Sequence, residues 1–319
     1  MSFISVIFAL LLEQARPLAR GNLIHATMRA WVRWCTRTFD TGQSVHGWMA
    51  WGLAVGGPAL SALLIYWLLG VFVAWPLAIL WSALVLYTTL GFRQFSFHFT
   101  QIRDALAEDD DVLANRLLAD WQHAEIKDQP RGEMIGEVIG FSVLAAHRHV
   151  FGVLAWFSLL AAFGLGPTGA VLYRLGEFVA RYWHHRSTSH HQPISAALLQ
   201  NAHQAWGLMD WLPARVTAIG FAVMGNFEEA IEGLQRYSLQ STVNNDSLIL
   251  AATAGALNID LRGAGAHSLE PSQQLGDDVF AMRPQPEQAH LAAVVGLVWR
   301  TVVIWIVLLA LLTLARLIG

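Results

Sequence analysis

Long apolar runs constrain this sequence more than any other feature. Four runs of about twenty residues, near 49–69, 71–91, 152–172 and 294–316, hold almost no charged side chains. A helix needs about 20 apolar residues to cross the hydrocarbon core of a bilayer. The sequence therefore predicts at least four membrane-crossing segments.

Composition also favours a membrane protein over a soluble globule. Of the 319 residues, 55% are hydrophobic and only 13% are charged, so polar side chains are too few to cover a soluble surface. The formal net charge of −3 and the lack of a zinc-finger, phosphate-loop or basic-array motif argue against nucleic acid as a partner. Cys35 is the single cysteine and is interpreted as a packing residue. The expected partner is the lipid bilayer.

The order of these runs predicts an all-α fold, a polytopic membrane helical bundle with amphipathic and extramembrane helices. Residues 1–91 hold a half-inserted first helix, a basic amphipathic helix at the membrane surface and a transmembrane hairpin. Helical periodicity within 92–140 predicts an extramembrane helical hairpin. Residues 141–226 form the central membrane segments with a polar site, 227–290 a soluble helix and loop region, and 291–319 the C-terminal transmembrane helix.

Positive charges indicate the orientation of the first hairpin. Arginine and lysine residues gather in the segments before and after it, so the positive-inside tendency places both segments in the cytoplasm. Residues 164–167, Gly-Leu-Gly-Pro, leave two paths open for the next run. The run either crosses outward or turns back as a re-entrant hairpin, and the orientation of residues 173–205 is left open.

Polar side chains at the ends of the central runs define the candidate site. Glu177 and Asp210 are the only acids between residues 140 and 225, so they are the predicted counter-ions of nearby arginines. If these two acids pair with two of Arg148, Arg174 and Arg215, the third guanidinium is able to hold an anionic small-molecule ligand such as a phosphate or carboxylate. The candidate ligand-binding residues are Arg148, Tyr173, Arg174, Glu177, Asp210, Arg215, His147 and His149.

Other interpretations of these residues stay open. His147 and His149 fall on different faces of a helix, so no metal site is predicted; Arg148 with its His neighbours either holds an anion or reaches toward the membrane interface. Asp210 and Arg215 either bind ligand or only fix the topology. The His pairs at 184–185 and 190–191 are read as a solvated loop, and the acids at 108–111 as a solvated helix end. No cofactor is predicted.

Several segments resemble the CobD/CbiB family of membrane proteins. They are residues 87–121, GPTGAVLYRLGEF at 166–178, MDWLPARVTA at 209–218 and ATAGALNIDLRGAG at 252–265. The resemblance implies a multi-pass protein of the bacterial inner membrane. Members with demonstrated chemistry are adenosylcobinamide-phosphate synthases, amide-forming ligases that join an aminopropanol phosphate to adenosylcobyric acid.

Polar motifs of those synthases are replaced in this chain. Residues 122–125, QHAE, stand where the family has Gly-Arg-Asp-Thr, and residues 146–151, AHRHVF, where it has Glu-Asn-Thr-Ser-Asp-Gly. The family's Asn and Asp after the Tyr-Arg pair fall on Glu177 and Ala180, and residues 242–247 keep the polarity of a late motif without its Pro or Gly. Because amide formation needs acid and base groups, these losses favour a protein without intact synthase chemistry.

A second branch of the superfamily accounts for these losses. AmpE-like inner-membrane proteins, associated with signalling that leads to β-lactamase induction, resemble this chain at 210–215 and at AVMGNFEEAIEG, residues 222–233. The predicted function is therefore an AmpE-like sensor or signalling modulator. The alternative is a cobalamin-biosynthesis enzyme of the synthase type, which segments 166–178 and 253–263 favour.

Overall fold

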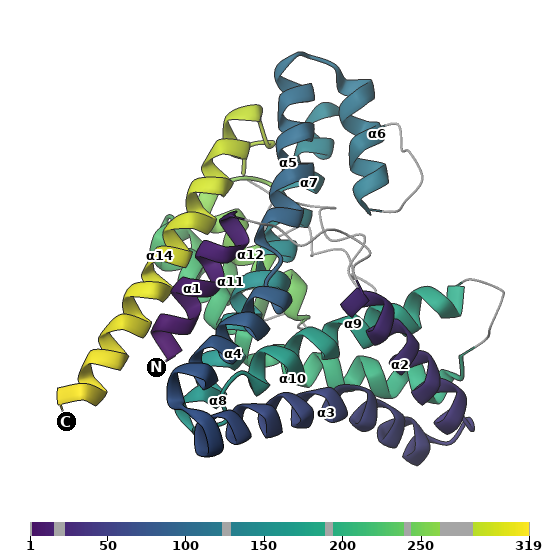
Figure 1. Cartoon of the computed structure of the whole chain (residues 1–319). Coiled ribbons are helices and arrows are strands. Elements are labelled where there is room, and N and C mark those ends of the chain that lie inside the picture. The colour runs from purple at the N-terminus through teal and green to yellow at the C-terminus, as the bar shows by residue number, and fades with distance from the viewer. Residues whose placement is uncertain are drawn as a thin grey trace. The chain divides into compact units, whose positions relative to one another are not determined.

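The structure is a computed structural model, and it describes most of the chain as helix. Within its described residues every regular element is helical, which confirms the all-α prediction (Figure 1). The chain divides into two compact units: unit 1 comprises Met1–Gly91, Arg148–Pro213 and Leu308–Gly319, and unit 2 comprises Phe92–His147 and Ala214–Val307. The described residues are 2–15, 23–122, 129–188, 194–238, 244–261 and 283–318.

Unit 1 is built around helix α3. This helix packs against α2, α4 and α9, while α1 packs against α4 and α8 against α9 (Figure 1). The bounds are α1 (Ser2–Ala15), α2 (Leu23–Phe39), α3 (Ser44–Leu68), η1 (Leu69–Val73), α4 (Trp75–Thr89), η2 (His147–Phe151), α8 (Gly152–Ala162), α9 (Thr168–Thr188) and α10 (Ala196–Met224). The first residue of η2 and the end of α10 belong to unit 2.

Helix α2 is amphipathic, as predicted. Its apolar face buries Val32 and Cys35 completely, in a cluster with alanines of α3 whose small side chains allow the two helices to approach closely. Trp183 of α9 adds a hydrogen bond from Nε1 to Thr36 Oγ1 at 2.8 Å. The arginines of α2 lie on its exposed face.

Two predicted runs are interrupted. The run at 71–91 begins as the π-helical turn η1, passes through an extended residue at Ala74 and continues as the 15-residue helix α4. The run at 152–172 ends at Ala162, and Gly164 and Gly166 then adopt φ values of 78° and 56°, a region that glycine enters without steric cost. Because α9 packs back on α8, a continuous helix over 152–172 is wrong, and the chain turns at 164–167.

Unit 2 contains the predicted helical hairpin. Helices α5 (Phe92–Ala107) and α6 (Asp111–Gln122) pack together. Asp110 begins α6 by accepting a hydrogen bond from the Leu113 amide at 2.9 Å, and Asp109 pairs with Arg131 at 2.8 Å. The acids at 108–111 therefore form an exposed helix start, in agreement with the sequence. The other elements are α7 (Arg131–Ala146), α11 (Phe227–Ser238), α12 (Asn245–Leu257) and α14 (Gln288–Ile318), which ends in unit 1.

Three helices in the described part of the chain are long and apolar enough to cross a membrane. They are Ser44–Val73, Arg131–Ala162 and Gln288–Ala315. In the first and last helices, only 17% and 33% of the 18-residue apolar stretch is buried, so both helices present apolar side chains outward. In the middle helix, 78% of that stretch is buried. The sequence predicted four such segments, and the structure gives three among its described residues. Helix α4 is too short, and the run predicted at 152–172 ends at Ala162 but continues the helix that begins at Arg131.

Candidate functional site

A buried polar contact lies between α9 and α10 in unit 1. Tyr173 donates a hydrogen bond from Oη to Asp210 Oδ1 at 2.7 Å, and the two residues are only 0% and 1% exposed. The ring of Tyr173 also packs against Trp206, with ring centroids 5.2 Å apart. Burial raises the pKa of the Tyr173 phenol well above its usual value, and the charge and hydrogen bond of Asp210 raise it further. Tyr173 is therefore a neutral donor that holds the Asp210 carboxylate.

Glycine residues permit this contact. A Cβ atom at Gly152 of α8 would lie 2.0 Å from Tyr173 Cζ, and one at Gly176 would lie 2.7 Å from Met209 Sδ. Trp156 joins α8 to α10 through a hydrogen bond from Nε1 to the Met209 carbonyl at 2.9 Å. The close approach of these three helices therefore depends on glycine at position 152.

One turn further along α9, a carboxylate lies between two arginines. Glu177 is 3% exposed, its Oε2 pairs with Arg174 Nη1, and its Oε1 lies 3.0 Å from Arg181 Nε. The spacings i, i+3 and i, i+4 place these side chains on one face of the helix. Glu177 thus has two arginine partners, and the cluster of two guanidinium groups and one carboxylate carries net positive charge.

Arg148 and His149 lie in the π-helical turn η2 of the same unit. Arg148 is 3% exposed, and its positive charge acts on both Tyr173 and His149. The His149 imidazole faces Gly91, where an added Cβ would lie 3.4 Å from Nδ1. Six of the eight candidate residues therefore belong to unit 1, namely Arg148, His149, Tyr173, Arg174, Glu177 and Asp210.

Arg215 and His147 belong to unit 2. Arg215 donates from Nη1 to Asn245 Oδ1 at 3.4 Å, and the fully buried His147 is hydrogen-bonded through Nδ1 to Thr217 Oγ1 at 2.9 Å. Asn244 caps α12 by accepting from the Asp246 amide at 2.7 Å. Arg215, from the segment 209–218, thus contacts Asn245, from the segment 242–247, at the start of α12. The pairing of Arg215 with a carboxylate of unit 1 stays a prediction.

The sequence analysis did not include Arg181 among the site residues, and it placed one His pair in a loop. The spacing of four residues from Glu177 to Arg181 was a signal that could have revealed the second guanidinium. His184 and His185 are exposed on α9 and not in a loop, while residues 190–191 lie outside the described residues. Among the described residues no group of three or more His, Cys, Asp or Glu side chains comes together in a way that suits a metal ion.

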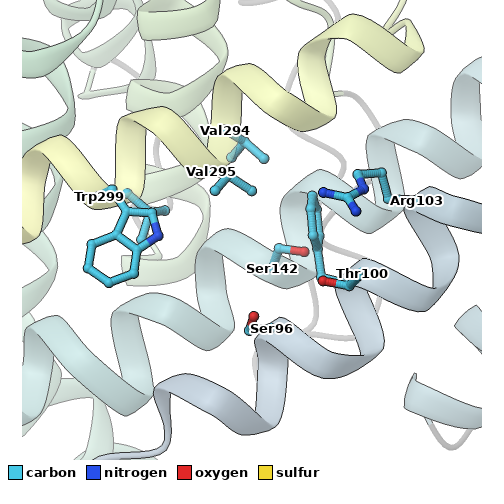
Figure 2. A pocket seen from close by; sticks show the side chains of 9 residues that line it. Ser96, Thr100, Arg103, Ser142, Val294, Val295 and Trp299 are labelled. Carbon is cyan, nitrogen blue, oxygen red and sulfur yellow. The ribbon is translucent and has the colours of Figure 1, made fainter. Parts of the chain in front are cut away.

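Each unit also contains a cavity. The large cavity, of about 510 Å³, lies in unit 1 among α2, α3, α4 and α9, and Arg174 reaches it. The small cavity, of about 230 Å³, lies in unit 2 among α5, α7 and α14. Figure 2 shows hydroxyl groups of Ser96, Thr100 and Ser142 on one wall of the small cavity and Val294, Val295 and Trp299 on the other. None of the candidate residues predicted from the sequence lines the small cavity.

These features define an all-helical protein with helices of membrane-crossing length and a buried site of arginines and carboxylates. The CobD/Cbib protein family model matches residues 6–298, so the chain belongs to this family. The cobalamin biosynthesis protein CobD of Stutzerimonas stutzeri (strain A1501) is 29% identical over 321 residues, which covers 96% of both chains. The protein of the same name from Chromobacterium violaceum is 27% identical over 265 residues, or 80% of this chain and 79% of its own. No solved structure matches the chain.

Proposed function

We propose that the protein is a membrane-bound enzyme of cobalamin biosynthesis, of the adenosylcobinamide-phosphate synthase type. In this role it joins an aminopropanol phosphate to adenosylcobyric acid through an amide bond. The observation that carries the proposal is the similarity, over 96% of both chains, to a relative named for cobalamin biosynthesis. This similarity favours the enzyme alternative over the AmpE-like interpretation. The proposed location is the bacterial inner membrane, crossed more than once.

The unit 1 site supports binding of the phosphorylated substrate. Guanidinium groups form charge-assisted, bidentate hydrogen bonds with phosphate oxygens. Arg174 and Arg181 share the single carboxylate of Glu177, so their joint charge exceeds that of their counter-ion. We assign the phosphate of the aminopropanol substrate to these two arginines, with Tyr173 and Asp210 fixing α9 against α10 beside them.

One structural observation favours a second candidate function, a sensor of the AmpE type. Residues 146–151 align with a synthase motif but lack its two carboxylates, and Arg148 within this segment is buried. Such a site binds an anion without the acid and base groups that turnover requires. In this function the protein would respond to an anionic small molecule and alter β-lactamase induction.

Genetic complementation tests the proposal. A bacterial strain that lacks its synthase would receive this gene, and corrinoid-dependent growth would be measured. We expect growth to be restored, the Arg174→Gln variant to fail, and the matched Arg186→Gln variant on the same helix to grow, because Arg186 contacts Tyr182 at 2.8 Å and not Glu177. Absence of growth from a well-expressed protein, together with a change in β-lactamase induction when the gene is deleted from its own host, would overturn the enzyme proposal and support the sensor.

A further inference from the structure

The large cavity of unit 1 has the size and lining of a ligand site. Its volume of about 510 Å³ falls within the range of roughly 300–1,000 Å³ that is typical of small-molecule sites. Apolar and aromatic side chains from four helices provide most of its wall. They include Trp31, Trp81 and Phe178.

Positive charge gathers at one part of this wall. Arg174 and His25 both line the cavity, and Arg29 follows His25 by one helical turn on α2. Burial and the positive charges of Arg174 and Arg29 lower the pKa of His25, so both arginines lie within electrostatic range of His25. The His25 Nδ1 atom is buried and has no hydrogen-bond partner among the residues that the structure describes. An anion at this position would compensate the charges and use the vacant imidazole nitrogen.

The walls of the cavity also belong to helices that suit a bilayer. Helix α3 contributes Gly57, Ser61 and Ile65 to the lining, and it lies within the candidate membrane span Ser44–Val73. The same span presents exposed apolar residues such as Leu60 and Leu64, which are 64% and 61% exposed. An apolar chain from the surrounding lipid therefore has a continuous apolar surface along α3.

We propose that this cavity binds an anionic lipid of the bilayer. Its phosphate head group contacts Arg174 and His25, and its apolar chain lies among Trp31, Trp81 and Phe178. The combination of a cationic edge with an apolar interior matches an amphipathic anion better than a fully polar substrate. This site does not depend on the synthase chemistry proposed above, although Arg174 borders both.

Native mass spectrometry of the full chain, delipidated in a mild detergent, tests the proposal. The probes are dioleoyl phosphatidylglycerol, dioleoyl phosphatidylcholine and inorganic phosphate. We expect one phosphatidylglycerol to bind per chain, at least about tenfold (about 1.4 kcal/mol) more tightly than phosphatidylcholine, because only phosphatidylglycerol brings a net negative charge to the arginine. Inorganic phosphate should not displace the lipid, because it lacks the apolar chain. Displacement by phosphate alone would identify a free-phosphate site and overturn the lipid assignment.

Variants in the wall separate the cavity from lipid that merely surrounds the protein. Ser61→Trp places a bulky ring in the cavity from an exposed position, so the fold tolerates it, and we expect about a tenfold loss of phosphatidylglycerol affinity. Leu64→Trp, on the same helix outside the lining, is the matched control and should bind normally. His25→Ala should reduce the preference for phosphatidylglycerol over phosphatidylcholine. Equal binding by Ser61→Trp, Leu64→Trp and the unmodified chain would overturn the proposal, whether or not the protein proves to be a synthase.

Discussion

At the scale of single residues, Tyr173 organises the candidate site. Its ring fills the space between α8, α9 and α10, and its hydroxyl group holds a carboxylate that is 1% exposed. A buried carboxylate is costly unless hydrogen-bond donors surround it. The position of Asp210 therefore depends on the Tyr173 hydroxyl and on the fit of its ring.

We predict that Tyr173→Phe destabilises the protein by about 1–3 kcal/mol, because Asp210 loses a buried donor while the ring packing is kept. Denaturation of the purified protein in detergent, followed by circular dichroism, measures the change. Tyr182→Phe is the control: this hydroxyl accepts a bond from Arg186 in a half-buried setting, and its loss should cost less than about 0.5 kcal/mol. Equal stability of Tyr173→Phe and the unmodified protein would show that the bond does not hold Asp210.

Gly152 provides a second prediction at this scale. In Gly152→Ala the new methyl group would lie 2.0 Å from Tyr173 Cζ, in a region where Trp206 also packs on the ring. We expect a loss of about 1–3 kcal/mol from overpacking, visible as a lower melting temperature. Gly52→Ala on α3 is the matched control, since nothing lies within 4 Å of the added Cβ there. This control should be neutral or more stable, because alanine favours a helix over glycine by up to about 1 kcal/mol.

At the scale of elements, the reactivity of the Cys35 thiol reports the docking of α2 on α3. Cys35 is the single cysteine, is fully buried against α3 and α9, and has its pKa raised to about 11 by burial. We predict that a maleimide reagent modifies it slowly at pH 8 and faster as pH rises, since the thiolate is the reactive form. The labelling rate in detergent then reports how often α2 separates from α3. Ala30→Cys in a Cys35→Ser background, exposed on the same helix, should react at once; similar rates at both positions would mean that α2 is not docked.

Some of these elements could be predicted from the sequence, and others could not. Hydrophobic periodicity predicted the α5–α6 hairpin and α11, because one face of each of those helices is buried and periodicity records this directly. The breaks at Ala74 and at 164–167 were harder to predict, since an apolar composition is the same in one long helix and in two shorter ones. At the site, charge counting predicted arginine counter-ions for Glu177 without assigning one, and it left out Arg181, which the structure pairs with Glu177 beside Arg174.

At the scale of the whole molecule, the membrane topology remains a prediction that labelling can test. Residue 110 immediately precedes α6, in a polar turn whose neighbour Asp109 has a side chain that is 82% exposed. We expect Asp110→Cys, in a Cys35→Ser background, to react with a membrane-impermeant maleimide in inverted vesicles and not in intact spheroplasts. Leu60→Cys on α3 should stay protected in both. Protection of residue 110 on both sides would place the α5–α6 hairpin in the bilayer and contradict the predicted arrangement.

The most direct test of the account is turnover by the purified protein in nanodiscs. The assay would supply adenosylcobyric acid and an aminopropanol phosphate, with ATP and Mg²⁺ because a carboxylate must be activated before it forms an amide. We predict formation of adenosylcobinamide phosphate, with a reduction of about tenfold or more in Arg174→Gln, since the loss of a charge-assisted contact to phosphate weakens binding by about 1.5–3 kcal/mol. The CobD relative of Stutzerimonas stutzeri is assayed in parallel for comparison. If that relative forms product under the same conditions and this protein forms none, the synthase function is contradicted.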